Sequence, residues 1–197
     1  MSKKEPVLYL LPLFFIIFLT GGCQTAYYNT MEKFGVHKRD IMVDRVEEAR
    51  DSQHEAKEQF QSALEQFSQV LNYKGGRLED KYNTLQAEYD KSEATANEVK
   101  DRIDAVEDVS EALFDEWDDE LDQYTSKSLR RESEKKLDKT QRQYEQLIKA
   151  MRKAEMKMNP VLKALKDQVL YLKHNLNAQA IASLQSELVA VESDIAE

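Results

Sequence analysis

The chain has few of the residues that end helices and form turns: 5 glycines and 3 prolines in 197 residues. Such a shortage excludes a fold of many short strands joined by tight turns and favours a few long elements. Cysteine is nearly absent, because Cys23 is the only one. The chain therefore forms no intramolecular disulfide, and its stability must come from packing.

The sequence also lacks the patterns of common catalytic and metal sites. Its three histidines, His37, His54 and His174, form no two-histidine metal motif. No phosphate-binding glycine loop or nucleophile motif is present, since Gly75 and Gly76 stand alone. A net charge of −9 disfavours nucleic acid as a partner. We therefore expect no enzyme, no metal or other cofactor, no small-molecule substrate and no nucleic-acid partner.

The first 22 residues differ in composition from the rest of the chain. Lys3 and Lys4 precede an apolar run of 13 residues, Val7 to Leu19. This run is too short to span a bilayer of about 30 Å, but it is typical of a secretory signal peptide. Thr20, two glycines and then Cys23 follow, and the cysteine thiol can take a diacylglycerol group. We predict a cleaved signal peptide at residues 1–22 and lipidation, with palmitate-type acyl chains, at Cys23.

Residues 19–23, Leu-Thr-Gly-Gly-Cys, resemble the lipobox of bacterial lipoproteins, although Thr20 stands where leucine is usual. In that group an aspartate after the cysteine directs retention in the inner membrane, and this chain has Gln24 there. The resemblance implies a place in the bacterial cell envelope, on the inner leaflet of the outer membrane, with the body in the periplasm. Three acyl chains would anchor it essentially permanently, whereas one chain binds only marginally.

We expect residues 23–39 to form a tether that either lies at the membrane surface or starts the first helix. Beyond this tether, apolar residues recur at alternating spacings of three and four. This heptad pattern is typical of long helices that pack along an apolar seam. It extends over 46–70, 78–117 and 137–158, and it is broken at Gly75 and Gly76 and at the hydroxyl-rich residues 124–128. The second stripe includes Ser92 and Ser110, and the third consists of Leu137, Thr140, Tyr144, Leu147, Met151, Ala154 and Met158. Pro160 interrupts the third stripe, which restarts at Leu162. For residues 40–197 we predict an all-α fold: an elongated antiparallel coiled-coil-like bundle of three long helices, the third kinked near Pro160.

The charge of consecutive segments supports the antiparallel pairing. Residues 77–124 contain 5 basic and 17 acidic residues, a net charge of −12, whereas 126–173 contain 14 and 6, a net charge of +8. Exposed ion pairs contribute only about 0–1 kcal/mol each, so they select the neighbour more than they stabilise the fold. The glycine turn also sets a register, in which Asp40 lies near position 110 and Lys173 lies near Arg77.

Two surfaces are candidates for contact with other molecules. Lys127, Arg130 and Arg131, next to the second break, are candidates for contact with phospholipid headgroups; the alternative is that they pair with nearby acids. Residues 174–186 contain no Asp, Glu, Lys or Arg. Four apolar residues there are candidates for binding a protein partner or for self-association: Leu176, Ala180, Ile181 and Leu184. This segment either extends past the turn or folds back after Asn175 to cover the bundle.

Four stretches of the mature chain are similar to one family: Cys23 to Tyr28 (Cys-Gln-Thr-Ala-Tyr-Tyr), His37 to Glu47, Ala112 to Asp118, and Gln168 to Ser183. They resemble an uncharacterised family of proteobacterial lipoproteins, a helical domain of unknown function. The resemblance implies an envelope location and a helical fold. It implies no activity and no catalytic residues.

The sequence therefore favours a lipoprotein whose helical body acts as a structural or protein-interaction module, with a scaffold or spacer role. It is held to the membrane by its lipid. The alternative is a membrane-shaping or envelope-stress adaptor that uses kinked helices. The sequence feature that favours this alternative is Pro160 within a long helix.

Overall fold

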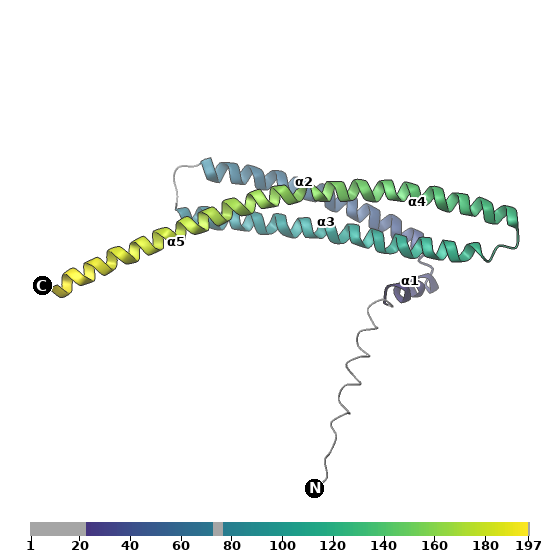
Figure 1. Ribbon diagram of the computed structural model, residues 1–197, viewed down its shortest axis with the longest axis horizontal. Coiled ribbons are helices and arrows are strands. Elements are labelled where there is room, and N and C mark those ends of the chain that lie inside the picture. Colours follow the sequence, from purple (N-terminus) through teal and green to yellow (C-terminus); the bar gives the residue numbers. More distant parts are fainter. Residues whose placement is uncertain (1–22, 73–76, 197) are drawn as a thin grey trace, which may run out of the picture. The chain divides into compact units, whose positions relative to one another are not determined.

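A computed structural model describes residues 23–72 and 77–196 of the chain, and all the secondary structure in these ranges is helical (Figure 1). The three long helices are α2, α3 and the joined α4 and α5, packed antiparallel, so the predicted fold class is confirmed. The helices span these residues: α1 Cys23–Lys33, α2 Lys38–Asn72, α3 Leu78–Leu121, α4 Lys127–Met156 and α5 Met158–Ala196.

The described residues group into two compact units, and each long helix contributes to both. The first unit contains the described residues up to Arg45 together with Ala105–Gln143. The second contains Val46–Asp104 and the residues from Tyr144 onward. In the second unit, parts of α2, α3 and α5 surround an apolar core, and in the first unit α1, α2 and α3 enclose a smaller buried cluster.

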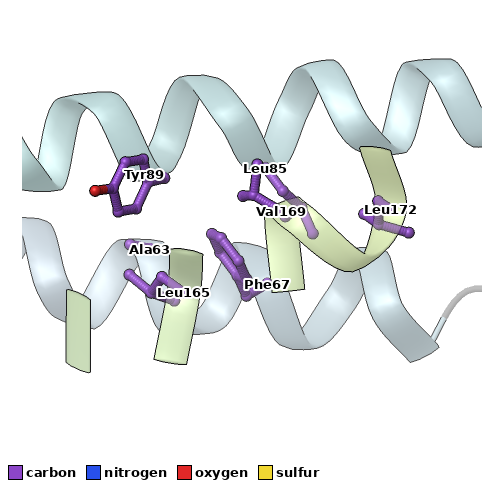
Figure 2. Packing of buried hydrophobic residues seen from close by; sticks show 7 residues of the cluster. All are labelled: Ala63, Phe67, Leu85, Tyr89, Leu165, Val169 and Leu172. Carbon is purple, nitrogen blue, oxygen red and sulfur yellow. The ribbon is translucent and has the colours of Figure 1, made fainter. Parts of the chain in front are cut away.

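The core of the second unit is built from the predicted heptad stripes. Figure 2 shows its seven buried residues, which come from α2, α3 and α5 and are Ala63, Phe67, Leu85, Tyr89, Leu165, Val169 and Leu172. Leu85 is fully buried, and the other six are at most 7% exposed. Burying a side chain of the size of leucine or phenylalanine stabilises the folded state by about 1.5–3 kcal/mol, so this cluster holds the three helices together.

Small polar residues also lie in the seam of α3. Ser92 and Ser110 are fully buried, at the predicted stripe positions. Each hydroxyl donates a hydrogen bond one turn back along the helix, Ser92 to the carbonyl of Glu88 (2.8 Å) and Ser110 to that of Val106 (2.6 Å). Because both hydroxyls have a partner within their own helix, their burial leaves no donor unsatisfied.

The third stripe follows the prediction only in part. Leu137 and Met151 are buried as expected, but Leu147 and Ala154 are exposed, and Ile148 takes the half-buried position instead of Leu147. An α-helix has 3.6 residues per turn, whereas a heptad repeat assumes 3.5, so the buried face drifts around the helix unless supercoiling compensates. The prediction for Leu147 and Ala154 was therefore wrong by about one position.

The break near Pro160 lies where the sequence places it. α4 and α5 are separated only by Lys157, whose backbone N–H donates to the carbonyl of Ala154 at 3.2 Å. Pro160 is the third residue of α5, within the first turn, where the missing N–H of proline does the least harm. The two helices meet at a bend of 13°, which is shallower than the sharp kinks above about 20° seen at many prolines.

Helix ends and register also agree with the sequence. Ser126 caps α4, because its Oγ accepts from the backbone N–H of Leu129 (3.5 Å). Ile41 and Val109 belong to one buried cluster, as the predicted pairing of residues 40 and 110 requires. Leu78 packs against the cluster that contains Leu172, which fits the predicted proximity of residues 77 and 173.

Candidate functional site

The lipidation candidate Cys23 is the first residue of α1, which is an ordered part of the first unit. The predicted signal peptide, residues 1–22, lies outside the described residues, and so does the side chain of Cys23. Within the predicted tether, residues 23–39, the structure forms α1 from the first eleven residues and joins this helix to α2 through a tight turn.

The turn after α1 is a Schellman motif centred on Gly35. Gly35 has a φ of +82°, which is the left-handed region that glycine adopts without strain. The N–H of Val36 donates to the carbonyl of Met31 (3.1 Å), and that of Gly35 donates to the carbonyl of Glu32 (2.9 Å). Two carbonyls at the end of α1 thereby gain partners, and the chain is directed into α2.

An apolar cluster fixes α1 against α2 and α3. Its buried members are Tyr28, Ile41 and Val109, one from each of the three helices. Four partly buried side chains pack against them: Met31, Val36, Met42 and Ala112. Burial and the nearby carboxylate of Asp108 raise the pKa of the Tyr28 phenol, so this ring is uncharged over the physiological range. The segment that follows Cys23 is thus docked on the helical body.

A buried lysine adds a charged contact to the apolar one. The side chain of Lys38 is 3% exposed, and its Nζ donates to Glu32 of α1 at 2.9 Å and to Glu116 of α3 at 3.0 Å. Burial opposes the charged form of Lys38, but the two hydrogen-bonded carboxylates outweigh it and raise the pKa of the ammonium group. The hydrogen bond from Lys38 lowers the pKa of Glu32. Lys38 and Glu32 are therefore both ionised near pH 7.

A shallow cavity of about 370 Å³ lies beside this ion triad. Trp117 lines it, and its Nε1 donates to Oγ of Ser133 on α4 at 2.8 Å. The cavity residues are Glu32, His37, Lys38, Arg39, Leu113, Glu116, Trp117 and Glu120. Because both carboxylates nearest to Lys38 are paired with it, this arrangement docks α1 on the helical body.

The basic candidates for membrane contact lie in the first turns of α4. Lys127, Arg130 and Arg131 are all exposed. Arg130 pairs with Asp122, with 2.8 Å between its Nη2 and Oδ1. That ion pair agrees with the alternative interpretation for Arg130, in which the basic residues pair with neighbouring acids. Contact of Lys127 and Arg131 with headgroups stays a prediction.

The candidate partner-binding residues lie on the last part of α5. Leu176 is half-buried, Ala180 is exposed and Ile181 is 58% exposed, while the side chain of Leu184 lies outside the described residues. The backbone stays helical from Met158 to Ala196. The segment after Asn175 therefore does not fold back, and the first of the two alternatives for it holds.

Within the described ranges, no three His, Cys, Asp or Glu side chains gather in a group that could hold a metal ion. Nε2 of His54 lies 3.3 Å from Oε1 of Glu58, one turn further along α2. None of the helices between residues 23 and 196 is long and apolar enough to cross a membrane.

The sequence analysis predicted neither the docking of α1 nor the role of Lys38. A signal for the docking was present, since Tyr28 and Met31 are spaced for one helix face and Gly35 follows at the usual place of a helix end. Nothing in the sequence distinguishes Lys38 from the other basic residues, because its burial depends on Glu116, which is distant in the chain.

Comparison with known proteins matches the chain to a protein family. A family model described as a protein of unknown function (DUF2959) matches residues 27–197. No curated protein matches the chain, and neither does any solved structure.

Proposed function

The chain belongs to the DUF2959 family of proteins of unknown function, and we propose that it is a lipoprotein of the bacterial outer membrane with a periplasmic body. The body acts as a structural or protein-interaction module, with a scaffold or spacer role. Support for the anchor comes from the apolar run before Gly21, Gly22 and Cys23, together with the absence of an aspartate at position 24.

The observation that carries the proposal is the docking of α1. This helix begins at Cys23, and five residues later Tyr28 is buried against Ile41 and Val109. At 1.5 Å per helical residue, Cys23 lies only about 8 Å along the helix from that contact. A lipid on Cys23 would therefore hold the first unit close to the membrane surface rather than on a long tether.

The interaction role is supported by the surface of α5. Ile181 is 58% exposed in a segment that carries no charged residue between 174 and 186. An exposed aliphatic residue of this kind is typical of a contact surface when its neighbours are uncharged. The bend of 13° at α4–α5 is shallow, so it adds no support to a membrane-shaping role.

Metabolic labelling with a palmitate analogue tests the anchor directly. Wild-type protein should incorporate the label and float with outer-membrane fractions. Cys23→Ser should lose both, because no other thiol exists in the chain. Thr25→Ser is the matched control, since it changes the same stretch without touching the thiol. Unlabelled wild-type protein in the soluble fraction would refute the anchor.

Photocrosslinking in cells tests the interaction role. A photoreactive residue at position 181 should give a specific crosslinked product, because Ile181 is exposed on the uncharged segment. The control position is Glu134, which is also exposed but lies on a charged part of α4. Equal products from both positions, or none from either, would contradict a contact surface on α5.

A further inference from the structure

The second unit carries a groove of about 830 Å³ between α2 and the junction of α4 and α5. Its floor is apolar: Phe60 is buried, and Met158 and Val161 are half-buried. Alanines at 56, 150 and 154 leave room above that floor because their side chains are short. All the residues that line this groove belong to the second unit.

The rim of the groove is basic, although the whole chain has a net charge of −9. Its lining contains no Asp or Glu, and its ionisable residues are Arg50, His54, Lys57, Lys153 and Lys157. Arg50 bonds Asp51 and His54 lies near Glu58, but both pairs are exposed. For the three lysines, no carboxylate of the described residues lies within ion-pair distance. The groove therefore suits an occupant with an apolar face and acidic flanks.

The last part of α5 has this chemistry. From residue 174 to the end, the sequence contains no Lys or Arg and four acids, Glu187, Glu192, Asp194 and Glu197. Its aliphatic residues follow a spacing of three and four, at Ile181, Leu184, Leu188, Val191 and Ile195. Each of the first three acids is the direct sequence neighbour of one of these aliphatic residues. In a heptad such positions flank the apolar seam, where charges select the partner.

The groove of the same chain is out of reach for this segment. α5 is one uninterrupted helix from Met158 to Ala196, so Val161 at the groove and Ile181 are about 30 Å apart along its axis. The helix would have to break for the segment to turn back. An acidic amphipathic helix can therefore reach the groove only from another molecule.

We propose that the end of α5 from one copy of the chain docks in the groove of a second copy, and that the exchange is reciprocal. This rests on the proposed interaction role and names the partner as the protein itself. The binding mode is that of an amphipathic helix in an apolar groove, with lysines of the rim facing the acids of the incoming helix. Two copies satisfy both grooves and both helix ends, so the assembly closes as a dimer.

The test measures the molar mass of the full chain, purified in detergent, by sedimentation over a range of concentrations. The groove variant carries Lys57→Glu, Lys153→Glu and Lys157→Glu, and the helix variant carries Glu187→Lys, Glu192→Lys and Asp194→Lys. We expect a wild-type dimer at micromolar concentration. Each variant should weaken it by about tenfold or more, because several ion pairs become repulsive.

The combined variant carries all six reversals and should dimerise again, because the charges are exchanged rather than lost. A matched control reverses three exposed cations of α4 away from the groove: Lys135, Lys139 and Arg142. This control should leave the mass unchanged. Ile181→Asp should also give monomers, and it replaces a side chain that is 58% exposed, so the fold should be unaffected.

Three results would overturn the proposal. They are a monomeric wild-type chain at all concentrations, a groove variant that dimerises like wild type, and a combined variant that stays monomeric while folded. Binding of anionic phospholipid vesicles that needs the three lysines in a monomeric chain would assign the groove to lipid instead. Loss of the membrane anchor would be seen separately, as unlabelled Cys23, and it leaves the mass measurement valid.

Discussion

Lys38 at the start of α2 donates a hydrogen bond to Glu116 of α3, 3.0 Å away, across 78 residues of sequence. The same ammonium group also bonds Glu32 of α1. One buried cation therefore joins three helices of the first unit, which also contains Cys23. Docking of α1 rests on this triad and on the apolar cluster around Tyr28.

Lys38→Met should loosen α1 while keeping most of the packing of the lysine stem. Loss of a fully buried ion pair costs about 3–5 kcal/mol, but Glu32 and Glu116 are 27% and 36% exposed and can be solvated. We therefore expect a smaller loss of unfolding free energy, about 1–2 kcal/mol, together with faster hydrogen exchange in α1. Urea denaturation and exchange mass spectrometry measure the two effects.

The control for this change is Lys33→Met, which alters an exposed lysine at the end of α1. Its denaturation midpoint should stay close to that of the wild type. If both variants lose the same free energy, or if exchange in α1 is unchanged in Lys38→Met, the ion triad does not hold the helix.

Acid should release α1 before it unfolds the rest of the chain. The hydrogen bond from Lys38 lowers the pKa of Glu32 in the folded chain. The contribution of Glu32 to folding stability is therefore fully present above its unfolded pKa of about 4.3, and it is lost as the pH falls through the folded pKa. The pKa of Lys38 is raised in the folded chain. The contribution of Lys38 to folding stability is therefore fully present below its unfolded pKa of about 10.4, and it is lost only as the pH rises through the folded pKa.

Trp117, the only tryptophan, reports this transition because it lines the cavity beside Glu32 and Lys38. Its fluorescence should be constant from about pH 5 to pH 10 and should change below that window. In Lys38→Met the acid transition should shrink. An identical acid transition in that variant would assign the change to other carboxylates.

Gly35→Ala should destabilise the turn that directs α1 into α2. The φ of +82° is costly for a residue with a Cβ, by about 1–2 kcal/mol, although no atom lies within 4 Å of the position where that Cβ would be. The penalty thus comes from the backbone conformation and not from a clash with neighbouring atoms. Gly35→Asn should cost less, because asparagine adopts the left-handed region more readily. Equal denaturation midpoints for the two variants would contradict this account.

The three long helices were predictable because one physical rule decides them. Apolar residues recur every three or four positions, as Ala63 and Phe67 do on α2, and only a helix brings that spacing to one face. The positions where the long helices end or bend were also predictable, since Ser126 offers a capping hydroxyl and Pro160 lacks a backbone donor. Even the register followed from the position of the turn, as the shared cluster of Ile41 and Val109 shows.

The candidate sites were less predictable because they depend on contacts between distant residues. Lys38 and Lys33 look alike in the sequence, and Lys38 is distinguished by its ion pair with Glu116 on another helix. The basic groove likewise combines Lys57 of α2 with Lys153 and Lys157 near the α4–α5 junction. In the third stripe the choice between Leu147 and Ile148 depended on a drift of the buried face that a strict repeat ignores.

Leu85→Ala should be among the most destabilising single changes in the second unit. Leu85 is fully buried in the cluster formed by α2, α3 and α5, so its truncation leaves a cavity that rigid helices cannot close. We expect a loss of about 2–5 kcal/mol in unfolding free energy. The matched control is Leu64→Ala on α2, because Leu64 is 50% exposed and its truncation removes little buried area. Urea denaturation should show a lower midpoint for Leu85→Ala at an unchanged slope. Equal losses for the two variants would mean that this seam does not supply the stability of the unit.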